Sequence, residues 1–122
     1  MSRDLNMPIT DSNLVREQCF IDGQWVDADS GETMDVTNKA TGEILGSVPK
    51  MGTDETRRAI EAANAALPAW RAKTAKERAV ILRKWFELML ENQQDLATLM
   101  TAEQGKPMAE SMGEVVYAAS FI

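Results

Sequence analysis

The segment Glu103-Gln104-Gly105-Lys106-Pro107 combines residue types that often carry chemistry. A Gly-Lys pair can bind phosphate, and an acid two positions before the glycine could act as a base. A phosphate-binding P-loop, however, requires G-x-x-x-x-G-K followed by Ser or Thr, so that backbone N–H groups surround the anion. Met100 stands where the first glycine belongs, and Pro107 replaces the hydroxyl residue and removes an N–H donor. The segment therefore predicts a joint, with Gly105 left-handed at one helix end and Pro107 in the first turn of the next helix.

Other catalytic arrangements are missing from the sequence. It contains no histidine, which excludes Ser-His-Asp and Cys-His pairs and an imidazole metal site. No two of its seven glycines are two positions apart, so the dinucleotide-binding pattern G-x-G-x-x-G is absent. Cys19 lies in a short apolar run and is interpreted as a packed small side chain, and Glu110 and Glu114 as solvated acids on one helix face. No catalytic, cofactor-binding or metal residue is predicted in this chain.

The composition is that of a soluble globular protein with one modest domain. The chain has 122 residues, of which 44% are hydrophobic and 26% charged. No apolar run approaches the ~18 residues that suggest a membrane span, and the N-terminus lacks the apolar stretch of a signal peptide. The single cysteine cannot form an internal disulfide. These features predict a cytoplasmic protein.

The net charge of −6 is unevenly distributed along the chain. Residues 57–84 hold eight Lys or Arg against two Asp or Glu, whereas residues 1–56 hold four against eleven and residues 85–122 one against six. A positive segment can attract phosphates or an anionic membrane. Because its charges are spread over two predicted helices and flanked by acidic segments, we interpret it as a solvated or internally paired face. No nucleic-acid or membrane partner is predicted, and an anion-binding protein is kept as a third hypothesis.

Two β-hairpins are predicted in the first part of the chain, within residues 18–49. One turns at Asp22-Gly23 and the other across residues 39–42, each between short β-prone runs. Two hairpins alone are marginally stable, so they must pack on something else.

About four α-helices are predicted within residues 53–122, where the apolar residues take helical spacing. Pro68 is expected to stop or kink the first helix. Thr74 and Glu77 have capping-box spacing at the start of the second helix, and Asn92 is expected to cap the third. The second helix is expected to have one broad apolar face, formed by Ile81, Leu82, Trp85, Phe86, Leu88 and Met89.

The last predicted helix reaches Phe121-Ile122 with two large apolar side chains, no cap residue, and no Lys or Arg near its end. We therefore expect residues 13–122 to be the front portion of a longer domain, truncated at Ile122, and residues 1–12 to form an N-terminal tail.

Several motifs, in order, resemble the N-terminal part of the NAD(P)-dependent aldehyde dehydrogenase superfamily. FIDGQWVDADSGETMDVTNKATGEILGSVPK is followed by LPAWRAKTAKERA, LMTAEQGKP and GEVVYAASFI. The resemblance covers about residues 13–122 and is greatest to bacterial succinate-semialdehyde dehydrogenases. Lys39 departs from the usual N-P-A-T-G-E motif, but losing a turn proline costs only its stiffening of the unfolded chain.

The resemblance implies a parent enzyme of the α/β class, with the aldehyde dehydrogenase fold and a Rossmann-like coenzyme domain. It implies a dimer or tetramer that oxidises an aldehyde, here succinate semialdehyde to succinate, with NAD or NADP. The reaction passes through a thiohemiacetal on a cysteine outside this chain. Neither Cys19 nor Glu103 takes the role of nucleophile or base.

Within this chain, the resemblance implies that the hairpins and first helices buttress the coenzyme domain. Tyr117 and Phe121 become candidates for lining the substrate entrance, while Gly105, Lys106 and Pro107 form the structural joint. The separate chain is expected to be inactive and to bind no cofactor. The competing hypothesis is a free-standing α+β protein-interaction module without enzymatic activity.

Overall fold

The first part of the chain forms two separate β-hairpins in the computed structural model, which describes residues 8–122. In the first, β1 (Cys19–Ile21) pairs with β2 (Gln24–Val26) around Asp22 and Gly23, whose φ angles are +50° and +75°. Two positive φ angles are typical of tight hairpin turns, because the backbone then follows the twist of the strands. The second hairpin pairs β3 (Thr33–Thr37) with β4 (Ile44–Pro49). The two predicted hairpins are confirmed.

Four helices follow, which confirms the predicted element order: α1 (Thr53–Ala72), α2 (Ala75–Glu91), α3 (Gln93–Gln104) and α4 (Met108–Ala119). A 3-10 turn at Ser12–Leu14 precedes the first strand. The proposed tail of residues 1–12 lies partly outside the described residues. Among the described residues, no helix combines the length and the apolarity needed to cross a membrane.

The helix boundaries agree with the sequence at two points and differ at one. The capping box of α2 is confirmed: Glu77 N–H donates to Thr74 Oγ1 at 3.3 Å, and Glu77 Oε2 accepts the Thr74 N–H at 2.7 Å. Helix α1 continues through Pro68 to Ala72, so the proline does not stop it. Asn92 is the N-cap residue of α3, as predicted, and its carbonyl accepts the Leu96 N–H at 3.0 Å. Its side chain makes no cap bond to α3, because its Nδ2 donates backward to the Leu88 carbonyl at 2.9 Å.

The prediction of one broad apolar face on α2 is wrong. The apolar residues form two stripes on different sides of the helix. Leu82, Phe86 and Met89 are half-buried, and the first two line a groove with the end of α4. The second stripe, spaced i, i+4, i+7, is exposed by 47%, 57% and 43% at Ile81, Trp85 and Leu88. Helix α2 therefore uses only one of its apolar sides within this chain.

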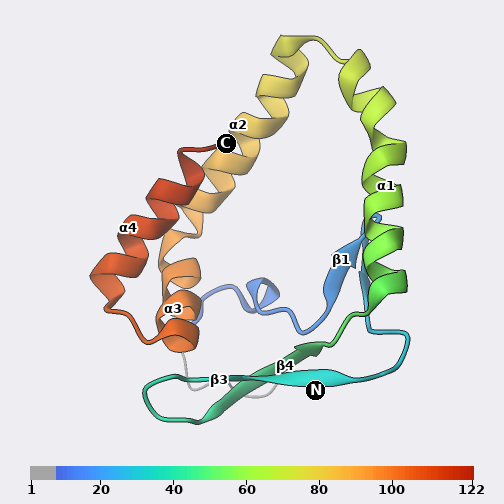
Figure 1. Ribbon diagram of the computed structural model, residues 1–122. Coiled ribbons are helices and arrows are strands. Elements are labelled where there is room, and N and C mark those ends of the chain that lie inside the picture. The colour runs from blue at the N-terminus through green and yellow to red at the C-terminus, as the bar shows by residue number, and fades with distance from the viewer. Residues whose placement is uncertain (1–7) are drawn as a thin grey trace.

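The elements form an open frame rather than a compact block (Figure 1). Helices α1 and α2 make two sides that meet at a corner, the β3–β4 hairpin lies across the opposite end, and α3 and α4 pack beside α2. The buried hydrophobic residues of the described part are Ala28, Ala97, Val115 and Ala119. Three of these four are alanines, so the described part has no core built from large side chains.

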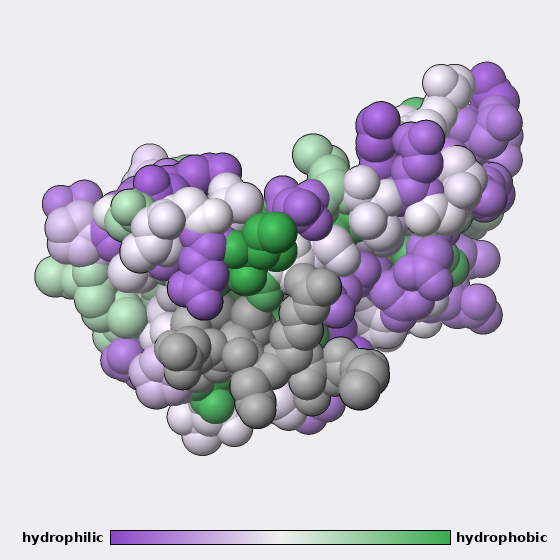
Figure 2. Space-filling model, turned by 90° about the horizontal axis from the view of Figure 1, so that it is seen from below, coloured by the Kyte–Doolittle hydropathy of each residue, from purple (hydrophilic) through white to green (hydrophobic). Residues whose placement is uncertain are grey.

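The surface area reflects this openness. It is 8908 Å², against about 6,500 Å² expected for a compact monomer of this mass. Seen from below, hydrophobic residues show at several places among hydrophilic ones, one of them near the middle of the view (Figure 2). The chain thus exposes apolar surface that most folded domains of its size bury.

Candidate functional site

The joint between α3 and α4 is shaped by Gly105 and Pro107. Gly105 has a φ of +83°, and its N–H donates to the Thr101 carbonyl at 2.8 Å, closing the last turn of α3. The Pro107 carbonyl accepts the N–H groups of Glu110 and Ser111 at 3.0 and 3.1 Å, opening α4. An added Cβ at Gly105 would meet nothing closer than 3.7 Å, so backbone conformation rather than space favours glycine.

Lys106, the cation of this joint, is occupied by an internal partner. Its side chain is only 15% exposed, and its Nζ pairs with Glu114 on α4. Pro107 supplies no N–H. A lysine held in this way and a helix start without a Gly-rich loop do not form a phosphate cradle. The arrangement fixes the angle between two helices.

Small residues hold α3 and α4 together. Ser111 is fully buried with its hydroxyl oxygen 2.8 Å from that of Thr101, and Gln93 Nε2 donates to the Met112 carbonyl at 3.0 Å. Because these bonds satisfy the buried polar atoms, the two helices pack closely without large side chains. These contacts hold α4 against α3.

An aromatic pair stands at that end of α4. The rings of Tyr117 and Phe121 lie 4.8 Å apart, edge to face at 81°, and the residues are 67% and 73% exposed. Val116 beside them is 47% exposed. The structure thus brings the two proposed entrance residues together as an apolar wall. Such a wall can exclude water and shape a path for a small molecule, but it supplies no nucleophile.

No other reactive centre is present among residues 8–122. Cys19 is half-buried in β1 opposite Val26, and Glu103 is exposed near the end of α3. No group of acids, cysteines and histidines in this part of the chain could hold a metal ion. Of the eight cations of the positive segment, four lie within 4.0 Å of a carboxylate: Arg57, Arg58, Arg83 and Lys84.

Two buried carboxylates were missed by sequence reasoning. Asp95 accepts the N–H of Thr10 at 3.0 and 3.1 Å and the N–H of Asp11 at 2.8 Å, across 84 or more residues. These bonds, that of Thr10 first, hold the pKa of Asp95 below its usual value, although burial opposes them. The only sequence signal is an acid in the first turn of α3.

The second buried carboxylate, Glu55, ties a loop to the start of α1. It accepts the N–H of Asp29 at 2.8 Å and the N–H of Gly52 at 3.0 Å. Backbone donors, Asp29 first, lower the pKa of Glu55 against the effect of burial. Arg58 adds two bonds of 2.8 Å to the Asp29 carboxylate, and these bonds lower the pKa of Asp29. The loop at Asp29 is thus held to the start of α1 by charge-assisted bonds.

Comparison with known proteins identifies the family. Residues 25–122 match the sequence profile of the aldehyde dehydrogenase family. The chain belongs to the aldehyde dehydrogenase family. The resemblance expected from the motifs is confirmed, and the expected aldehyde dehydrogenase fold is that of the solved structures that this chain matches.

Several of the relatives are semialdehyde dehydrogenases. The chain is 69% identical over 116 residues to succinate-semialdehyde dehydrogenase (NADP+) of Escherichia coli and 68% identical over 116 residues to glutarate-semialdehyde dehydrogenase of Pseudomonas putida. Each match covers 95% of this chain and 24% of the relative. A crystal structure of an E. coli NADP-dependent enzyme matches with a TM-score of 0.91 at 69% identity, over 93% of this chain and 24% of that one.

The chain therefore spans about a quarter of the length of the curated relatives it matches. The candidate site residues of this chain form a helix joint and an aromatic wall. They do not form a complete active site.

Proposed function

We propose that this chain is the N-terminal portion of an enzyme that oxidises a semialdehyde, succinate semialdehyde foremost, to the carboxylate. The reaction consumes the aldehyde, one water and NAD+ or NADP+, and releases the acid and the reduced coenzyme. The observation that carries this proposal is the 69% identity over 116 residues to the succinate-semialdehyde dehydrogenase of E. coli. The reaction would take place in the cytoplasm, in a dimer or tetramer.

The described residues do not fit the coenzyme. They contain no Gly-rich loop, and the lysine of the α3–α4 joint is paired with Glu114. In this proposal the described residues take no part in the chemical step. Residues 13–122, with the hairpins in 18–49 and the helices in 53–122, have a scaffolding role in this proposal.

Tyr117 and Phe121 are proposed to line the aldehyde entrance. Their exposure and edge-to-face contact support this role, because an apolar wall removes water from a passing aldehyde without bonding to it. The joint at Gly105, Lys106 and Pro107 supports the wall by fixing the direction of α4.

A chimera tests the proposed function. This chain replaces the matching quarter of the E. coli relative, and NADPH formation with succinate semialdehyde is followed at 340 nm. The chimera should turn over, and the separate 122-residue chain should not. A folded chimera that oxidises no semialdehyde, or turnover by the separate chain, would contradict the proposal.

The entrance role needs its own variants. Phe121→Ala and Tyr117→Ala in the chimera should raise KM for succinate semialdehyde more than they lower kcat, because the wall touches the substrate on its way in. Ala118→Ser, exposed and between them in sequence, is the matched control. Unchanged KM in both aromatic variants would exclude the entrance role without affecting the assignment of the activity.

A further inference from the structure

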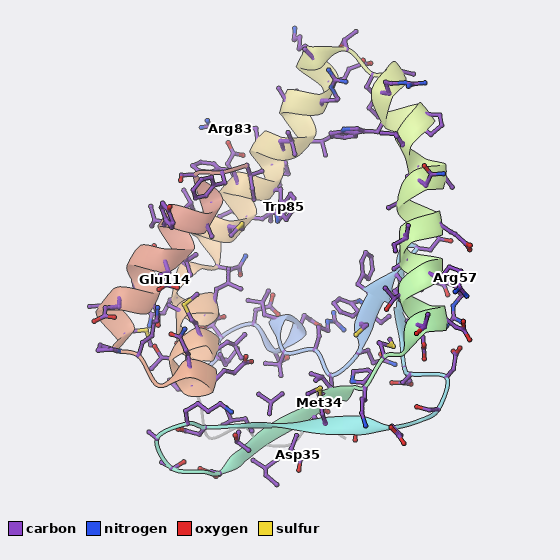
Figure 3. All side chains as sticks on the ribbon, viewed as in Figure 1. Met34, Asp35, Arg57, Arg83, Trp85 and Glu114 are labelled. Atoms are coloured by element: carbon purple, nitrogen blue, oxygen red, sulfur yellow. The ribbon has the colours of Figure 1, made fainter. Side chains whose placement is uncertain are left out.

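A groove beside the proposed aldehyde entrance is bordered by cations. It lies between α2 and the end of the chain, and we call it the α2–α4 groove. Its charged and polar lining includes Lys76, Arg83 and Lys84 from α2 and Ser120 after α4. Ser120 is the direct neighbour of Phe121, a residue of the aromatic wall. Arg83 points to the outer side of α2, on the side of the groove (Figure 3).

The α2–α4 groove carries a net positive charge. Arg83 Nε lies 2.9 Å from the carboxylate of Glu87, which also lines the groove, and Lys84 Nζ lies 4.0 Å from that of Glu91, which does not. Among residues 8–122, no ion pair includes Lys76. Three cations and one acid in the lining leave a net charge of +2. The side chains of Arg83 and Lys84 are 71% and 61% exposed, so their charges act on ions in the surrounding water.

The helices that carry the wall and its support give an anion no comparable attraction. The whole chain has a net charge of −6, and residues 85–122 hold six acids against one cation, Lys106. Lys106 is already paired with Glu114 on α4. Within the part of the chain that the structure describes, positive charge beside the wall therefore comes from α2.

We propose that Lys76, Arg83 and Lys84 attract aldehydes with a second, anionic group to the entrance, and so favour them over neutral aldehydes. The proposal rests on the proposed function and adds to it a substrate class and the residues that select this class. Charges of one sign beside a cleft raise the local concentration and the capture rate of an oppositely charged substrate, by roughly 10-fold or more in strong cases. The three cations act through their field. They determine specificity and are not catalytic residues.

Neutralising the three cations in the chimera tests the proposal. Lys76→Gln, Arg83→Gln and Lys84→Gln are combined, and kcat/KM is measured for succinate semialdehyde and for butanal, which has the same chain length and no carboxylate. At about 0.01 M ionic strength the screening length is about 30 Å. There the triple variant should lose about 3-fold or more of kcat/KM for succinate semialdehyde and keep its value for butanal. At about 1 M salt the screening length is about 3 Å, and the two proteins should agree.

A second triple variant removes the same charge elsewhere: Lys39→Gln, Lys50→Gln and Arg57→Gln. Arg57 lies on the outer side of α1, across the frame from Arg83 (Figure 3). This variant should leave kcat/KM near that of the unchanged chimera for both aldehydes. Each single variant of the groove should give part of the loss, because a field is the sum of its charges. A loss confined to one residue would overturn the proposal in favour of a direct contact.

Acylation of lysines adds a test that does not depend on activity. In the folded chimera, Lys76 and Lys84 should react with an amine-acylating reagent about as fast as Lys50, whose side chain is 64% exposed. Protection of both lysines would overturn the proposal, because a covered groove cannot attract a substrate from water. Equal losses for both aldehydes, or a loss that persists at high salt, would overturn it as well.

These results separate the proposal from the proposed function. A folded chimera that oxidises no aldehyde contradicts the proposed function, and the role of the groove falls with it. A chimera that oxidises succinate semialdehyde with a kcat/KM independent of these three charges overturns the role of the groove alone.

Discussion

At the scale of single residues, Gly105 carries the change of direction between α3 and α4. An alanine there would keep the left-handed φ of +83° at a cost of about 1–2 kcal/mol. We expect Gly105→Ala to lower the unfolding free energy of the chimera by that amount in urea. Gly113→Ala is the control, because this helical glycine has no neighbour within 4 Å of an added Cβ and should gain about 0.5–1 kcal/mol. Equal effects of the two changes would mean that backbone conformation does not explain the glycine.

Asp95 is a second residue with a measurable consequence, through pH. Its pKa is lowered in the folded protein by the N–H groups of Thr10 and Asp11. A lowered folded pKa means that the stabilisation is complete above the unfolded value of about 3.9 and is lost as pH falls through the folded pKa. Amide exchange of residues 8–15, corrected for intrinsic rates, should therefore be slow at pH 6–8 and accelerate below about pH 4.

The control for this prediction is Asp95→Asn in the same chimera. Its side chain keeps one acceptor oxygen and cannot titrate, so exchange of residues 8–15 should be faster at pH 7 and less dependent on pH. Residues 108–119 of α4 serve as the internal reference. A segment 8–15 whose exchange is unchanged by Asp95→Asn would show that the carboxylate does not hold it.

At the scale of elements, the capping box of α2 makes a separate prediction. The Thr74 hydroxyl accepts the N–H of Glu77, and replacing such an N-cap by alanine typically costs about 1 kcal/mol. Thr74→Ala in the chimera should lower the urea midpoint accordingly, while Thr74→Ser, which keeps the hydroxyl, should not. Equal midpoints for the two variants would mean that packing, rather than the cap, begins this helix.

Local signals explain which elements could be predicted from the sequence. The turn at Asp22-Gly23 and the capping box at Thr74 act within a few residues, so pattern alone placed β1, β2 and the start of α2. Pro68 does not stop α1, which continues to Ala72, and a kink at the proline stays a prediction. Asn92 was placed correctly at the start of α3, but its side chain bonds to α2, and only its carbonyl bonds to α3.

Long-range contacts explain what the sequence could not give. Asp95 reaches Thr10 across 85 positions and Glu55 reaches Asp29 across 26, and no periodicity records such pairs. The sequence predicted one apolar face on α2 where the structure has two stripes. Helical spacing identifies which residues are apolar, but it does not show which of them a neighbouring element covers. At the candidate site, residue type pointed to Gly105 and Pro107, and the four-residue spacing of Tyr117 and Phe121 favours one helix face, but the edge-to-face contact of the rings is seen only in the structure.

At the scale of the whole molecule, the frame is held together by polar bonds between distant segments rather than by a large hydrophobic core. Asp95 joins the N-terminal segment to α3, Glu55 and Arg58 join the loop at Asp29 to α1, and Glu17 accepts the N–H of Ser47 at 3.1 Å. Several large apolar residues stay exposed, Phe20, Ile60 and Leu67 among them. Polar bonds thus define the shape of this chain. Burial of large apolar side chains, which normally drives folding, contributes little in its described part.

This balance predicts how the separate 122-residue chain behaves in solution. A compact domain of this length has a radius of gyration of about 14 Å, and an open frame should exceed that value in X-ray scattering. Exposed apolar faces should also bind a hydrophobic dye such as ANS strongly and favour association. The chimera is the control, because the same faces should be covered there and dye binding per chain should fall. A separate chain that is monomeric, close to 14 Å, free of dye and cooperative on heating would instead be a free-standing α+β module, and the scaffold role would be wrong.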